Sequence, residues 1–178
     1  RGQESLLTTA DAMHSTNMRV GPQGVSCVFE RLTDDGANIG GGFGKVLAYD
    51  PETKALTYTD GDNYYPGLPT PFEEGDEIVL FSREGKNIGE AVAASAEHMV
   101  GGAHQVILDR DVTIEPGTLI ENLSANCAGV TFDNCLMDTT RSRGLLIKAP
   151  DATITHCTIR NVGMAAILVK PETKDGWN

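Results

Sequence analysis

Three aspartates near the start of the chain have the residue type and the spacing for acid–base chemistry. Asp11 lies 24 residues before Asp35, and Asp34 is the immediate neighbour of Asp35. If the two segments stack as adjacent parallel strands, about 4.8 Å apart, the carboxyl groups come together. A like charge within about 4–6 Å raises one carboxyl pKa, which leaves a protonated acid beside an ionised base. Glycoside hydrolysis needs this combination, because one carboxyl protonates the leaving oxygen while the other activates water or attacks carbon.

Four further residues extend the candidate site. We expect His14 and Asn38 to point outward from the same strands, where they can hydrogen-bond to sugar hydroxyls. A sequence repeat of about 22 residues places Arg143 in the same column as Asp11 and Asp35, so Arg143 either pairs with Asp35 or holds a substrate oxygen. Trp177 offers an aromatic surface on which a sugar ring can stack. We therefore predict catalytic roles for the aspartates and substrate-binding roles for these four residues.

The aspartates also have a plainer interpretation as turn residues. Residues 33–36 have the sequence Thr-Asp-Asp-Gly, and Asp-Gly is a common bend signal. Unpaired like charges in neighbouring strands destabilise a sheet, however, and persist mostly where they are used. Both interpretations stay open, and a raised pKa for one aspartate favours catalysis.

A repeat of about 22 residues predicts the strands that position these side chains. Cys135 and Cys157 are 22 residues apart, and so are Lys148 and Lys170. This period is typical of a solenoid. Four rows align, namely Asp11-Ala-Met-His-Ser-Thr, Asp35-Gly-Ala-Asn-Ile-Gly, Arg143-Gly-Leu-Leu-Ile-Lys and Ala165-Ala-Ile-Leu-Val-Lys. By the two-residue period of a strand, the third and fifth columns point inward and the fourth and sixth outward.

The predicted fold is all-β, a right-handed parallel β-helix with an inserted small β-barrel-like domain. We expect β-helix coils in residues 1–42, the inserted domain in 43–113, and further coils in 114–178. The repeat is absent from the middle segment, where residues 45–59 have the alternation and central turn of a β-hairpin. Within that segment, residues 90–99 are predicted as one short helix.

The composition limits the partners and cofactors. The net charge of -11 argues against nucleic acid and anionic membranes as partners. The sequence contains no run of about 18 apolar residues, so it does not predict membrane insertion. The 4 cysteines form no Cys-x-x-Cys pair and have no His-x-x-x-His nearby, so neither a zinc site nor a redox motif is indicated. We predict no cofactor. Open ends of a strand stack favour edge pairing, so a homo-oligomer is compatible with the sequence.

Five segments occur in an order that is found in a known family. They are Asp11-Ala-Met-His-Ser-Thr-Asn, Asp34-Asp-Gly-Ala-Asn-Ile, Gly75-Asp-Glu-Ile, Thr140-Arg-Ser-Arg-Gly-Leu-Leu-Ile and Gly163-Met-Ala-Ala-Ile-Leu-Val. In these segments the chain resembles the exo-α-1,3-galactosidases of glycoside hydrolase family 110. The resemblance covers most of the 178 residues.

The resemblance implies a secreted or periplasmic enzyme that acts on an oligosaccharide or polysaccharide. Such an enzyme removes terminal α-1,3-linked galactose with inversion and without a metal. Carried over by position, Asp11, Asp34 and Asp35 form the acidic centre, with one as general acid and another as general base. Inverting enzymes hold these two carboxyls roughly 6.5–9.5 Å apart, so directly stacked Asp11 and Asp35 are close for that pair.

Two other functions remain open on the same fold, since a fold does not determine a function. One is a different polysaccharide reaction, by a lyase or an endo-acting hydrolase, although a lyase generally needs a basic residue where this chain has an acidic edge. The other is a non-catalytic glycan-binding module, in which the aspartates only form turns.

Overall fold

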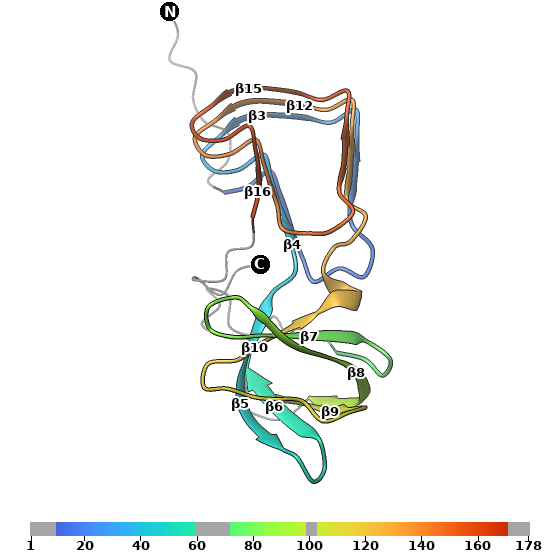
Figure 1. Ribbon diagram of the computed structural model, residues 1–178. Coiled ribbons are helices and arrows are strands. Elements are labelled where there is room, and N and C mark those ends of the chain that lie inside the picture. Colours follow the sequence, from blue (N-terminus) through green and yellow to red (C-terminus); the bar gives the residue numbers. More distant parts are fainter. Residues whose placement is uncertain (1–9, 60–71, 99–102, 171–178) are drawn as a thin grey trace, which may run out of the picture. The chain divides into compact units, whose positions relative to one another are not determined.

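The structure is a computed structural model that describes residues 10–59, 72–98 and 103–170 (Figure 1). The chain divides into two compact units. The first, here called the parallel-sheet unit, ends at Gly40 and resumes at Cys127, and the second, the barrel unit, extends from Gly41 to Asn126. Among the residues described, no helix combines the length and the apolar character that crossing a bilayer requires.

Short strands of the parallel-sheet unit form three sheets in which neighbouring strands are parallel. Figure 1 shows one of them, with β3, β12 and β15 side by side. The four-stranded sheet contains β1 (Met13–Thr16), β4 (Ala37–Gly40), β13 (Leu145–Ile147) and β16 (Ile167–Val169). The two three-stranded sheets contain β2 (Gln23–Val25), β11 (Thr131–Asp133) and β14 (Thr153–Thr155), and β3 (Val28–Leu32), β12 (Leu136–Thr140) and β15 (Thr158–Val162).

The four-stranded sheet has the register that the repeat predicts. Ala37 lies between Met13 and Leu145, and Leu145 lies next to Ile167. Aligned positions of the repeat are therefore neighbours in space, which confirms the alignment of the four rows.

The second column of the repeat contains Ala12, Gly36, Gly144 and Ala166, and close backbone approach explains its two glycines. A Cβ atom at Gly36 would lie 2.3 Å from the carbonyl oxygen of Gly144, and one at Gly144 would lie 2.5 Å from that of Ala166. Neither position has room for a side chain, so glycine allows successive strands to stack immediately after Asp35 and Arg143.

The core of the parallel-sheet unit lies between its sheets. Ala37, Ile39 and Ile147 have no exposed surface, as the inward columns predict. Leu146 is also fully buried, although its column was predicted to point outward. Val169 is 72% exposed because β16 is the edge strand of its sheet.

The barrel unit is a closed barrel of six strands paired in antiparallel fashion. Its apolar core includes Leu56, Tyr58 and Ile120, each at most 1% exposed. The strands, in barrel order, are β10 (Leu119–Asn122), β5 (Phe43–Asp50), β6 (Ala55–Thr59), β9 (Ala103–Leu108), β8 (Asn87–His98) and β7 (Glu77–Phe81). A short 3₁₀ helix, η1 (Leu123–Ala125), follows β10.

Two predictions inside the barrel have opposite outcomes. The predicted hairpin is confirmed, because β5 pairs with β6 across the turn after Asp50. The predicted helix at residues 90–99 is wrong, because most of this segment belongs to β8, which pairs with β7 on one side and β9 on the other. Pairing with two neighbours outweighs the helix propensity of an alanine-rich segment.

The prediction of a right-handed parallel β-helix is wrong, although a β-barrel does interrupt the other unit in the middle of the chain. The chain is all-β, but a closed antiparallel barrel forms one unit, and the parallel strands of the other lie in small sheets of three or four strands. The repeat specifies which residues pair between neighbouring strands. The alignment of four rows predicts this local pairing, but it does not predict how the sheets are arranged over the whole chain.

The unit boundaries also lie at different places from those expected. The chain enters the barrel unit at Gly41 and leaves it after Asn126. The boundary predicted after residue 113 therefore falls within the barrel unit, ahead of β10. β10 belongs there because it pairs with both β5 and β7 and so closes the barrel.

Candidate functional site

Asp35 is the buried centre of the candidate site. It lies just before β4 and has no exposed surface. Its Oδ1 accepts hydrogen bonds from the backbone N–H of Arg143 at 2.8 Å and from Arg143 Nε at 2.9 Å. Its Oδ2 lies 2.8 Å from Arg143 Nη2. The guanidinium therefore compensates the charge of this carboxylate on both oxygens.

Asp11 lies just before β1, the strand that pairs with β4, and its side chain binds the backbone of Asp35. Its Oδ1 accepts a hydrogen bond from the backbone N–H of Asp35 at 3.1 Å, and its Oδ2 lies 3.2 Å from His14 Nδ1. Burial by itself raises the pKa of Asp11. The hydrogen bonds from His14, Asp35 and Asn38, with the charge of His14, outweigh burial and hold that pKa below its usual range.

Asp34 differs from its two neighbours because it is exposed. Partial loss of water raises its pKa, and the negative charges of Asp11 and Asp35 raise it further. The charge of Arg143 and a hydrogen bond from the Asp35 backbone oppose this rise only in part. The surroundings therefore shift the two pKa values in opposite directions, upward for Asp34 and downward for Asp11.

The three aspartates, here called the acidic edge, form one compact group. One carboxylate oxygen from each lies within 4.8 Å of the others. Such oxygens suit hard cations such as calcium or magnesium. A cation here would have to compete with Arg143 for Asp35 and with His14 for Asp11, because both oxygens of each carboxylate already have partners.

The structure brings most of the predicted site residues together. His14 and Arg143 contact the acidic edge directly. Asn38 lies opposite His14 in the register of β1 and β4 and is partly exposed. Its side chain hydrogen-bonds to the Asp11 carboxylate. Trp177 lies outside the described residues.

Two other Asp-containing pairs in the same unit resemble parts of the site. Asp133 Oδ1 lies 2.8 Å from His156 Nδ1, and Arg160 Nη2 lies 2.8 Å from Asp138 Oδ2. The hydrogen bond from His156 is the main cause of a lowered pKa for Asp133, and bonds from Asn161 and Arg160 lower that of Asp138. These pairs provide matched controls for the acidic edge.

Glu121 is a functional candidate that the sequence did not suggest. It lies in β10, is only 8% exposed, and burial raises its pKa to about 7, against a hydrogen bond from Asn126. A carboxyl that titrates near neutral pH is typical of functional sites. The sequence signal that could have indicated Glu121 was a charged residue directly after the apolar pair Leu119-Ile120.

The chain matches no protein-family model and no curated protein sequence. Its likeness to glycoside hydrolase family 110 therefore stays a prediction that rests on the five segments.

Proposed function

We propose that the chain is a glycoside hydrolase that uses the acidic edge for general acid and base catalysis. The observation that carries this proposal is the divergence of two neighbouring carboxyl groups, since the pKa of Asp34 is raised and that of Asp11 is lowered. Environments that separate the pKa values of adjacent carboxyls distinguish a catalytic acid from a catalytic base.

This divergence supports the following roles for the aspartates. Asp34 is the general acid and donates its proton to the glycosidic oxygen as the bond from that oxygen to the anomeric carbon breaks. Asp11 is the general base and takes a proton from the water that attacks the anomeric carbon. Solvent then returns Asp34 to its acid form and Asp11 to its base form. Asp35 and Arg143 are positioning residues, because their ion pair orients the backbone N–H that binds Asp11.

Terminal α-linked galactose is the proposed substrate group because of the resemblance to the exo-α-1,3-galactosidases. An inverting reaction needs roughly 6.5–9.5 Å between the two carboxyls, to admit a water molecule. The nearest oxygens of the acidic edge lie within 4.8 Å of one another, so inversion requires the exposed Asp34 side chain to turn away from Asp11. Residence outside the cytoplasm and self-association remain predictions.

A non-catalytic glycan-binding module is the second candidate. It is favoured by the structural contacts of two aspartates, since Asp11 binds a backbone N–H and Asp35 forms a buried ion pair. In that case Asp34 has no chemical role, and its replacement leaves the behaviour of the chain unchanged.

The test is release of galactose from an α-1,3-linked galactobioside by the whole chain and by Asp34→Asn and Asp11→Asn variants. Asp133→Asn is the matched control, because Asp133 also contacts a histidine but does not belong to the acidic edge. We expect Asp34→Asn to lower kcat by about 10²–10⁴-fold, the usual contribution of general acid–base catalysis, while the control keeps wild-type activity.

Two results would overturn the proposal. One is the absence of galactose release by a folded wild-type chain, and the other is an Asp34→Asn variant as active as the control. The anomer that NMR detects first then decides the stereochemistry, since inversion of an α-galactoside yields β-galactose.

A further inference from the structure

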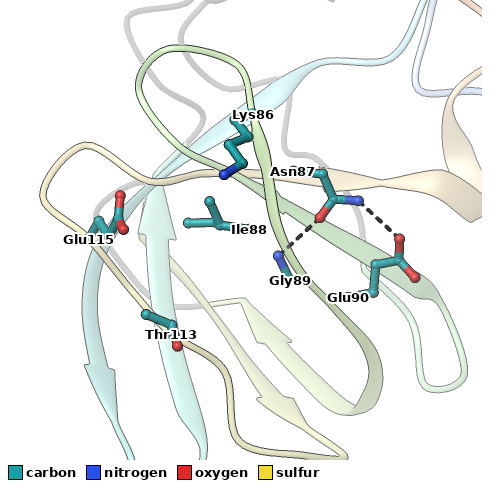
Figure 2. A pocket seen from close by; sticks show the side chains of 7 residues that line it. All are labelled: Lys86, Asn87, Ile88, Gly89, Glu90, Thr113 and Glu115. Atoms are coloured by element: carbon teal, nitrogen blue, oxygen red, sulfur yellow. Dashed lines mark hydrogen bonds between the residues drawn. The ribbon is translucent and has the colours of Figure 1, made fainter.

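The barrel unit has a surface cavity that the acid–base chemistry does not use. Its volume is about 530 Å³, within the range of small-molecule sites. Figure 2 shows its lining, which comes from the start of β8 and from the segment that precedes β10. The lining residues are Lys86, Asn87, Ile88, Gly89, Glu90, Thr113 and Glu115.

The lining combines an apolar floor with hydrogen-bonding groups of both kinds. Figure 2 shows Ile88 with Lys86, Thr113 and Glu115 around it. Ile88 is partly buried and packs on the barrel core, so its position is determined by the fold. Lys86 carries an ammonium donor, Glu115 a carboxylate acceptor, and Thr113 a hydroxyl that does both. The ammonium and carboxylate make no hydrogen bond or ion pair within the part of the chain that the structure describes.

A local network orders one side of the cavity. Asn87 Nδ2 donates to Glu90 Oε1 at 3.0 Å, and Asn87 Oδ1 accepts from the backbone N–H of Gly89, also at 3.0 Å. Both bonds appear as dashed lines in Figure 2. They hold the first residues of β8 in one conformation, which reduces the ordering that a ligand would have to impose.

We propose that this cavity binds a neutral sugar ring. A sugar has C–H groups for Ile88 and hydroxyls that donate to Glu115 and accept from Lys86. An anion suits the cavity less well, because two carboxylates line it and the net charge of the chain is -11. A simple cation would leave the Lys86 ammonium facing a like charge. The inference goes beyond the proposed hydrolysis, because a sugar site here requires no catalysis.

The experiment is an NMR titration of the whole ¹⁵N-labelled chain with methyl α-galactoside and methyl α-glucoside, and with acetate as a charged probe. We expect at least one sugar to shift the amide signals of Ile88, Gly89 and Thr113 to saturation. A Lys86→Ala, Glu115→Gln double variant should weaken that binding by about ten-fold or more, since each removes a hydrogen bond to a charged group. Lys45→Ala, Glu77→Gln is the control, because both residues are exposed barrel residues outside the cavity.

Three results would overturn the inference. They are the absence of shifts with both sugars, equal sugar affinity in the cavity and control variants, and a response to acetate as strong as that to sugar. The Asp34→Asn variant separates this site from the proposed hydrolysis. Unchanged shifts in that variant support a site in the barrel, whether or not the chain releases galactose.

Discussion

The parallel-sheet unit contains two Asp–Arg ion pairs of the same length in different surroundings. Asp35 and Arg143 approach to 2.8 Å with side chains 0% and 16% exposed, whereas Asp138 and Arg160 approach to 2.8 Å with 12% and 59% exposed. Among the described residues, only the first pair belongs to a group of three carboxylates with oxygens within 4.8 Å of one another. Contact distance therefore does not identify a functional site. Burial and the crowding of like charges distinguish the acidic edge from an ordinary link between strands.

The largest effect on stability is expected from Asp35→Asn. This change leaves the mostly buried Arg143 guanidinium without its carboxylate, so we expect a loss of about 3 kcal/mol, as for other broken buried pairs. Hydrogen exchange of the β4 and β13 amides measures the free energy of opening in the unit concerned. Asp138→Asn is the control, and it should change this free energy little because water solvates Arg160. Equal losses in the two variants would contradict the comparison.

Glu121 sharpens the comparison, because it is a buried carboxyl whose pKa burial raises to about 7. The folded barrel binds this proton more tightly than the unfolded chain, so the Glu121 contribution to stability falls as the pH rises from about 4.5 to about 7. The expected loss is on the order of 3 kcal/mol. Glu121→Gln should remove this dependence.

Urea unfolding between pH 4.5 and 8 measures the effect. Tyrosine fluorescence reports on the barrel unit, since all 4 tyrosines lie between Gly41 and Asn126. The stability of the variant relative to wild type should increase across this range. A difference that does not vary with pH would show that Glu121 keeps an ordinary pKa.

The smallest effect is expected at the two Asp–His contacts. Removing His14 with His14→Ala leaves the burial of Asp11 in place but removes a hydrogen bond and a charge, so the pKa of Asp11 should rise. His156→Ala should likewise raise the pKa of Asp133, which His156 holds down. Carboxyl NMR titration measures both. Only the change at Asp11 should alter the pH dependence of galactose release, and a similar alteration by His156→Ala would contradict the assignment of the base.

The repeat was sufficient to predict the stacking of Asp11 on Asp35, because aligned residues of a short period become neighbours in parallel strands. The column of Ala and Gly was informative for a similar reason, since Gly36 and Gly144 face backbone atoms where a side chain has no room. At these positions the sequence repeat alone was enough to predict which residues pair between neighbouring strands.

The closed barrel and its boundaries could not be obtained in the same way. β10 belongs to the barrel because of its pairing with β5 and β7, which lie far from it in sequence. The same holds for β8, whose alanine-rich sequence favours a helix until two neighbouring strands pair with it. The raised pKa of Glu121 is likewise a product of tertiary burial.

The most direct test of the acidic edge is a carboxyl NMR titration of Asp11 and Asp34 in the wild-type chain. An unperturbed aspartate titrates near pH 3.9. The proposed division into acid and base predicts that Asp34 titrates above this value and Asp11 below it, and that Asp11→Asn lowers the pKa of Asp34 by removing a neighbouring charge. An Asp34 that titrates at or below Asp11 would contradict the division and leave the aspartates as turn residues.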